Sequence, residues 1–202
     1  MATTTVEIDT ELSAVNSILG AIGQAPVTTL DFDNPEVAFV YNILAEVNKD
    51  VQNEGWHFNT EYHVEVIPDG SKNITIPNNY LRYDLHGPHD KTMDLVRRNG
   101  KLYDLVDHTD EFDNNLDLDI VYLYAFEDVP PVFQRYIIAR AASRAAAQLI
   151  ANPQLVQLLK TEESVARASI INYECEQGDH SFLGHRHDTA YKSYQPFDAL
   201  RR

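Results

Sequence analysis

Apolar residues near the beginning of the chain recur at intervals of three and four positions, which is the spacing of one helix face. The first set comprises Leu12, Val15, Ile18, Leu19 and Ile22. The second set comprises Val37, Val40, Tyr41, Leu44, Val47 and Val51. These sets predict amphipathic helices over residues 9–22 and 35–54, and Gly55 is a suitable residue to follow the end of the second helix.

The period of the apolar residues changes to two after Trp56, which indicates strands. Strands are predicted for residues 58–68, for the short sequence "ITIP" at 74–77 and for residues 116–124. Residues 92–106 predict a hairpin, because Asn99 and Gly100 join two strand-like runs and this pair favours a type I′ turn. The middle of the chain is therefore predicted to be a compact β region.

Helical spacing returns in the last third of the chain. Residues 131–151 are rich in alanine and other strong helix formers, so they predict a third helix. Asn152 and Pro153 interrupt it, and residues 153–177 predict a fourth helix. The apolar face expected for this fourth helix comprises Leu155, Leu158, Leu159, Val165, Ala166 and Ile170.

The order of these elements predicts an α+β fold. Two helical pairs flank one β region, so the N- and C-terminal helices are expected to form an antiparallel helical bundle with an inserted antiparallel β domain and an extended C-terminal tail. The expected divisions are residues 1–55 with 129–178 for the bundle, 56–128 for the β domain and 179–202 for the tail.

Composition limits the classes of function. The 202 residues are 44% hydrophobic, which is typical of a globular protein, and the formal net charge is −15. Because phosphate binding depends on Lys and Arg, a nucleic-acid-sequestering protein is disfavoured. The single cysteine, Cys175, excludes an intrachain disulfide. The first residues predict no signal peptide, and no apolar run predicts a membrane anchor.

The acidic stretch from residue 102 to residue 128 contains no Lys or Arg. Its carboxylates are the only basis for an enzyme hypothesis, because a glycosidase needs two carboxyl groups that face each other across a sugar. They are scattered over strands and a loop, so a solvated acidic face is the favoured interpretation. A loose calcium site remains an alternative, although the stretch lacks the central glycine and final glutamate of an EF-hand.

No cofactor, metal or catalytic residue is predicted. Two histidine groups offer metal-ligand chemistry, one around His86 and His89 and the other at His180, His185 and His187. Zinc needs ligands held on a rigid scaffold in a tetrahedron, and the second group lies in a stretch without period. Exposed histidines that form hydrogen bonds are the favoured interpretation of both groups.

The C-terminal stretch combines aromatic and basic residues, the types that dominate protein interfaces. They are Phe182, Arg186, Tyr191, Lys192, Tyr194, Phe197, Arg201 and Arg202. A docking arm is the favoured interpretation, and a frayed terminus is the alternative.

The sequence "NEGWHFN" at residues 53–59 holds the single tryptophan, Trp56. It lies where the helical period ends and the strand period begins. Gly55, Trp56 and Phe58 are therefore predicted to anchor the junction of the two regions, with the indole N–H donating to a carbonyl. An exposed platform of a carbohydrate-binding module is the alternative.

Several stretches together resemble the tail tubular protein A family of short-tailed bacteriophages. They are "ELSAVNSILGAIGQAPVTTLD", "GWHFN", "NNYLRYD", "NGKLYDLVDHTDEFD" and "VPPVFQRYIIARAASR". The resemblance implies a structural virion protein, assembled in the host cytoplasm and placed in the tail. Members of the family form a dodecameric adaptor or gatekeeper ring that joins the portal to the nozzle, tail tubular protein B, and supports fibre attachment. DNA is ejected through the bore of the ring.

The resemblance also suggests partners for the surfaces of the chain. The C-terminal arm would reach the portal protein. The hairpin comprising Arg97, Arg98, Asn99, Gly100 and Lys101 would face the nozzle or the tail fibre. An acidic bore would let DNA pass without sequence-specific binding. The competing hypothesis is a tail-associated glycan or peptidoglycan hydrolase that uses carboxylates of the acidic β region.

Overall fold

The computed structural model describes residues 10–86, 93–150 and 152–177, in which four helices and five strands are present. The helices are α1 (Glu11–Ala21), α2 (Pro35–Gln52), α3 (Pro131–Leu149) and α4 (Pro153–Gln177). The strands are β1 (Thr60–Val66), β2 (Tyr80–Leu85), β3 (Leu95–Arg98), β4 (Lys101–Asp104) and β5 (Leu116–Tyr122). The predicted α+β class is confirmed. We call residues 11–52 and 125–177 the helical half and residues 60–124 the β half.

Local side chains set where the helices begin. The Thr10 hydroxyl accepts a hydrogen bond from the Ser13 N–H at 3.3 Å, which caps α1. The Asn34 side chain accepts from the Glu36 N–H at 3.0 Å, and Pro35 occupies the first position of α2. These caps explain why the starts predicted for the first two helices lie within two residues of the observed ones.

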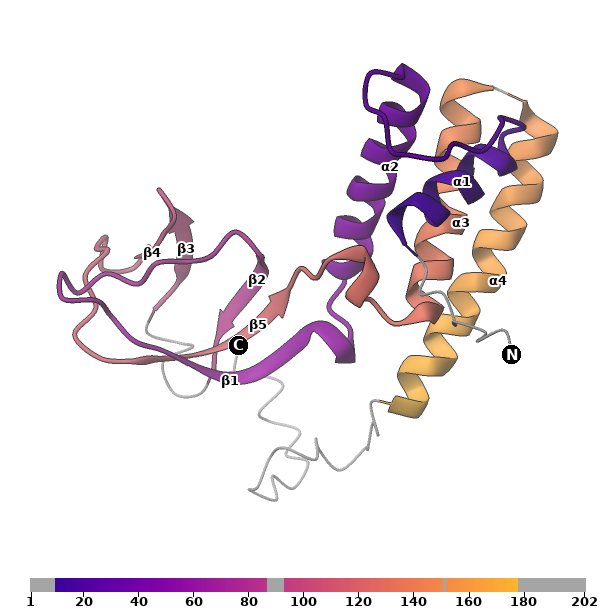
Figure 1. Ribbon diagram of the computed structural model, residues 1–202. Helices are drawn as coiled ribbons and strands as arrows, with labels where there is room; N and C mark the ends of the chain where they lie inside the picture. Colours follow the sequence, from indigo (N-terminus) through magenta and orange to yellow (C-terminus); the bar gives the residue numbers. More distant parts are fainter. Residues whose placement is uncertain (1–9, 87–92, 151, 178–202) are drawn as a thin grey trace, which may run out of the picture.

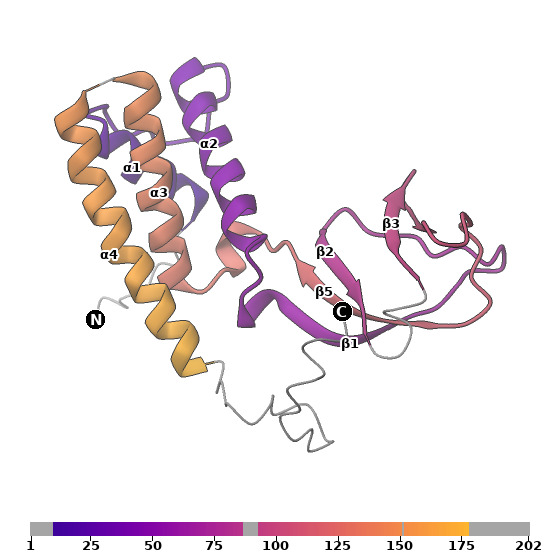
Figure 2. The ribbon, with the colours of Figure 1, turned by 180° about the vertical axis from the view of Figure 1, so that it is seen from behind.

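Helix α3 is the centre of the helical half and packs against α1, α2 and α4. Its buried face includes Phe133, Ile137, Ala141 and Ala145. In Figure 1, α2 and α4 lie on opposite sides of α3, and Figure 2 shows the same arrangement from behind. The small alanine side chains of α3 let its neighbours approach closely.

The apolar face predicted for α4 is partly wrong. Leu159, Ala166 and Ile170 are buried as expected, but Leu158 and Val165 are 58% and 64% exposed. The reason is that α4 packs almost entirely against α3, so only a narrow stripe of the helix is covered. A bundle helix with two neighbours would bury a wider face.

The larger sheet of the β half is antiparallel, with the strand order β1-β5-β2. Leu116, Leu118 and Ile120 of the central strand β5 are buried, and Asp117 and Asp119 lie between them on the other face. This alternation is the period-two pattern that predicted the strand. Strand β1 has an irregular register between residues 61 and 64.

Strands β3 and β4 form the predicted hairpin. Both Asn99 and Gly100 have positive φ angles, 51° and 78°, as a type I′ turn requires. The strand predicted at residues 74–77 is wrong, because only an isolated bridge joins Thr75 to Lys101 there. Pro77 offers no N–H, so the ladder cannot continue past it.

Two separate clusters of buried apolar side chains form the cores of the helical half and the β half. The β half extends to one side of the helices (Figure 1). Within the described ranges, no helix combines the length and the apolarity needed to cross a membrane.

Candidate functional sites at the junction, the hairpin and the acidic sheet

The chain passes from the helical half to the β half at Gly55. Its φ angle is +80°, a region that residues with a side chain rarely adopt. A Cβ atom at this position would lie 2.9 Å from Nη2 of Arg82 and 3.4 Å from Cγ2 of Val121. Glycine therefore lets the backbone turn and approach the sheet closely.

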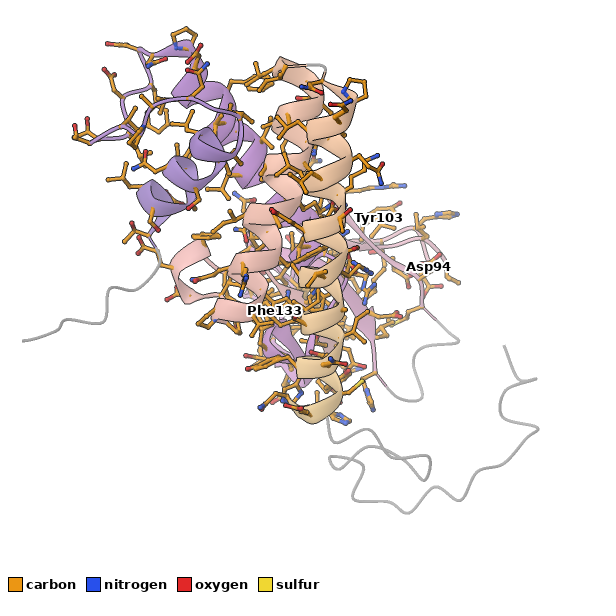
Figure 3. The ribbon with its side chains drawn as sticks, turned by 90° about the vertical axis from the view of Figure 1, so that its right-hand side faces the viewer. Asp94, Tyr103 and Phe133 are labelled. Carbon is orange, nitrogen blue, oxygen red and sulfur yellow. The ribbon has the colours of Figure 1, made fainter. Side chains whose placement is uncertain are left out.

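Trp56 is buried in the core of the helical half, with 9% of its surface exposed. Its indole N–H donates to the Val51 carbonyl oxygen at 2.7 Å, as the sequence predicted. The Trp56 ring packs edge-on against the Phe133 ring, with centroids 5.1 Å apart. The Phe58 ring also packs against Phe133, with centroids 4.8 Å apart. Figure 3 labels Phe133 among the helices. Because its ring and its N–H are both engaged, Trp56 offers no open platform for a ligand.

Two buried amides, Gln52 and Asn59, cross the junction, and neither was predicted. The Gln52 amide exchanges two hydrogen bonds with the Tyr124 backbone, at 2.8 and 3.0 Å. The Asn59 amide donates to the carbonyl oxygens of Gln52 and Tyr122, both at 2.8 Å, and accepts from the Trp56 N–H. Both side chains are 0% exposed, so these hydrogen bonds are shielded from water.

Ion pairs join Glu54, which follows the end of α2, to α3 and α4. Arg167 of α4 donates to both carboxylate oxygens of Glu54, at 3.3 and 3.1 Å, and to the Tyr136 hydroxyl at 3.0 Å. The hydrogen bond to Glu54 is the largest cause that raises the Arg167 pKa above its usual value. Arg140 of α3 reaches the same carboxylate at 3.5 Å.

The hairpin carries three cationic side chains, and each of them contacts an uncharged side chain. Arg97 donates to the Asn78 side-chain oxygen, and Lys101 Nζ donates to the Asn73 side-chain oxygen at 2.6 Å. The Arg98 guanidinium lies 3.9 Å from the centroid of the Tyr103 ring, which is labelled in Figure 3. In the part of the chain that the structure describes, none of the three forms an ion pair. The hairpin is therefore a cationic surface on an acidic protein.

Asp117 and Asp119 of β5 are each paired with a histidine. His63 Nδ1 lies 3.1 Å from Asp117, and His86 Nδ1 lies 3.0 Å from Asp119. The two imidazole rings are 3.7 Å apart between centroids. The sequence did not predict these pairs, because each histidine is more than thirty positions from its aspartate. Within the described ranges, no three side chains of His, Cys, Asp or Glu lie close enough together to hold a metal ion.

Other acids of the stretch from residue 102 to residue 128 stabilise loops. The buried Asp104 carboxylate accepts hydrogen bonds from the N–H groups of Asp94 and Val106, at 3.1 and 2.9 Å. Lys72 Nζ lies 2.6 Å from Asp113, and this contact lowers the pKa of the Asp113 carboxyl group. These contacts give Asp104 and Asp113 a structural role that does not require a substrate.

The comparisons with known proteins concern most of the chain. The profile of the family described as "Tail tubular protein" matches residues 12–180. The chain belongs to the tail tubular protein family. It is also 32% identical over 120 residues to "Tail tubular protein A" of Klebsiella phage KP34, a match that spans 59% of this chain and 62% of that relative.

As a tail tubular protein, the chain is a structural component of phage tails, which confirms the resemblance seen in the sequence. The family match includes the helical half, the junction, the hairpin and the acidic sheet. The docking arm predicted from the sequence, from Phe182 to Arg202, lies beyond the matched residues and outside the described ones.

Proposed function

We propose that this tail tubular protein is the subunit of an adaptor ring, a dodecamer in the virion, that joins the portal to the nozzle. The ring would support fibre attachment and form part of the channel for DNA ejection. The observation that carries the proposal is the family match, which spans both halves of the molecule. A ring between two partners needs lateral faces toward its own copies and axial faces toward the partners.

Each partner is assigned a surface on chemical grounds. The cationic hairpin at Arg97, Arg98 and Lys101 would face the nozzle or the fibre, because none of its charges forms an ion pair in the described part of the subunit. The aromatic and basic arm at residues 182–202 would bind the portal. The net charge of −15 would keep passing DNA from adhering to the channel wall.

The buried junction supports this proposal mechanically. The buried amides of Gln52 and Asn59 fix the β half to the helical half through shielded hydrogen bonds. A subunit that holds the portal at one end and the nozzle at the other needs such a connection, because a loose hinge would not transmit their relative position.

Co-purification with the partner proteins tests the assignments. Deletion of residues 181–202 should abolish binding to portal rings and leave the circular dichroism spectrum unchanged. Replacement of Arg97, Arg98 and Lys101 by alanine should leave portal binding intact and weaken binding to the nozzle or the fibre. If the truncated protein still co-purifies with portal rings, the arm assignment is wrong.

A hydrolase assay separates the proposal from the enzyme hypothesis. The purified protein should release no product from peptidoglycan or capsular glycans. If product is released and Asp117→Asn or Asp119→Asn abolishes the release, the acidic sheet is a catalytic site and the purely structural proposal fails.

A further inference from the structure

The small sheet of the β half is open along one edge. Strand β3 pairs with β4 on one side, and within the described ranges neither a further strand nor an isolated bridge pairs with β3. Strand β4 is closed on its other side. The Leu102 N–H donates to the Ile74 carbonyl oxygen at 2.9 Å, and the Asp104 N–H donates to the Thr109 carbonyl oxygen at 2.8 Å. The outer side of β3 is therefore where this sheet can accept another strand.

The register of the hairpin shows which backbone groups point to this edge. Leu102 is the partner of Arg97, and its N–H donates away from β3. The same holds for Asp104, the partner of Leu95. In an antiparallel ladder, pairs that exchange hydrogen bonds alternate with pairs that do not. Arg97 and Leu95 belong to the second kind, so their N–H and C=O groups point outward, whereas those of the other two residues of β3 point to β4.

Two guanidinium groups flank the open edge, one on each face of the strand. Arg97 shares a face with Leu95, which packs against the core of the β half. Arg98 lies on the opposite face, where its guanidinium is 3.9 Å from the centroid of the Tyr103 ring. Both arginines are exposed, and in the part of the chain that the structure describes neither forms an ion pair. A strand added at this edge would meet a cation on each of its faces.

The acids nearest to β3 in the hairpin leave these two charges in place. Asp94 is exposed, but it precedes β3 and lies at the end of the strand away from the turn, roughly 10 Å along the chain from Arg97. Asp104 is 0% exposed, and its carboxylate accepts hydrogen bonds from the N–H groups of Asp94 and Val106. The end of the edge beside the turn is therefore cationic.

We propose that an extended acidic segment of a partner protein adds to β3 as a third strand of this sheet, with two consecutive acidic residues beside Arg97 and Arg98. This inference rests on the proposed function, which assigns the hairpin to the nozzle or the fibre, and it adds how the partner binds. Main-chain groups of the segment would continue the ladder. Successive side chains of a strand point to opposite faces, so two neighbouring carboxylates would each reach one guanidinium.

Charge selects an acidic segment over a second copy of the same edge. Two β3 strands paired with each other would bring their arginines together, and charged residues on an edge strand oppose such self-pairing. The edge is also short, because only Leu95 and Arg97 turn their backbone groups outward, so side chains must add to the affinity. The stacking of Arg98 on Tyr103 engages the face of the guanidinium and leaves the N–H groups at its rim to donate to a carboxylate.

Amide hydrogen exchange in the full chain separates strand addition from simple charge attraction. The probe is a synthetic peptide with blocked ends and the sequence Thr-Val-Thr-Glu-Glu-Thr-Val-Thr. Near saturation, it should slow exchange of the Leu95 and Arg97 amides by about tenfold. The amides of Val96 and Arg98, which already face β4, should change little. Binding without this alternation, or no binding at millimolar peptide, would overturn the proposal.

Two further peptides serve as controls. The same peptide with methylated backbone nitrogens keeps its charge but cannot donate to the ladder, so it should protect neither outward amide. A peptide with lysine in place of glutamate should not bind. Protection that appears without peptide and rises with protein concentration would identify a second copy as the occupant and would also overturn the proposal.

Charge reversal tests the two arginines. Arg97→Glu with Arg98→Glu should weaken binding of the acidic peptide by about tenfold or more and allow the lysine peptide to bind. The milder pair Arg97→Gln with Arg98→Gln should weaken binding in the same direction. Lys49→Glu with Lys160→Glu is the matched control, because it changes the net charge as much as the first pair at two exposed positions of the helical half. Equal losses in the first pair and the control would show that the arginines do not bind the segment.

Failure of this inference can be distinguished from failure of the proposed function. If the arginine variants lose the nozzle or the fibre but the peptide gives no alternating protection, the hairpin assignment stands and strand addition is wrong. If the peptide protects Leu95 and Arg97 but the variants still bind the nozzle and the fibre normally, the open edge is a binding site and the hairpin assignment is wrong.

Discussion

Gly55 shows how one residue without a side chain connects the two halves. Substitution by alanine would force a Cβ atom into a positive φ angle and to within 2.9 Å of Arg82 Nη2. Gly55→Ala should therefore lower the free energy of unfolding by about 1–2 kcal/mol in urea denaturation. Gly20 is the matched control, because it lies in α1 with nothing within 4 Å of its added Cβ. Gly20→Ala should stabilise by about 0.5–1 kcal/mol, and equal losses at both positions would contradict this explanation.

Asn59 has a similar role through hydrogen bonds rather than backbone geometry. Asn59→Ala would remove the partner of the Trp56 N–H and the donor to two carbonyl oxygens, all within a shielded junction. The expected loss of unfolding free energy is about 3 kcal/mol, because buried polar groups would be left unpaired. Asn42 is exposed on α2, so Asn42→Ala should change stability by less than about 0.5 kcal/mol. Comparable losses would show that Asn59 is not a structural link.

At the scale of elements, α4 depends on a single neighbouring helix for most of its packing. It packs almost entirely against α3, and two polar contacts join it to the segment that follows α2: Arg167 pairs with Glu54, and Glu174 accepts from the His57 N–H. Arg167→Ala should cost only about 1 kcal/mol, because both side chains are partly exposed and solvent screens the pair. Hydrogen exchange should nevertheless quicken selectively in α4. Lys160→Ala, at an exposed position without an ion pair, should leave the exchange unchanged, and uniform quickening across all helices would contradict the selective effect.

The larger sheet should lose stability at alkaline pH. Burial, together with hydrogen bonds to Tyr80 and Glu61, raises the pKa of Tyr122 above its usual value near 10. The unfolded chain therefore loses this proton at lower pH than the folded protein, so stability is complete below pH 10 and falls as the pH rises above it. Unfolding free energies measured between about pH 8 and pH 11 should show this decline. Tyr122→Phe should make the unfolding free energy fall less steeply with pH. If the dependence on pH is unchanged, other groups cause the decline.

At the scale of the whole molecule, the net charge of −15 predicts that the protein does not bind duplex DNA. The full chain should not retard linear duplex DNA in a gel, even at about 50 mM salt, because phosphate binding depends on clustered Lys and Arg. The cationic hairpin is too small a patch to reverse this repulsion. Retardation that weakens as salt is added would contradict the proposed channel wall and would point to a DNA-binding face.

Features that depend on residues close together in the sequence were predicted well, and features that depend on distant residues were not. Helix starts at Thr10 and Asn34 and the turn at Asn99 and Gly100 depend on neighbouring residues, so the sequence predicted them closely. The exposure of Leu158 and Val165 could not be predicted, because a periodic pattern does not state how many neighbours a helix has.

By itself, the sequence determined the helices, most strands, the α+β class and the family, because these depend on local periodicity, capping and recognisable motifs. Only the tertiary structure decided how the halves are joined. Gln52 contacts Tyr124 across 72 positions and Asn59 contacts Tyr122 across 63, and no local pattern indicates that these amides are buried. The same holds for the histidines beside Asp117 and Asp119. Such sites form where segments distant in the sequence come together in the fold, so local sequence patterns do not indicate them.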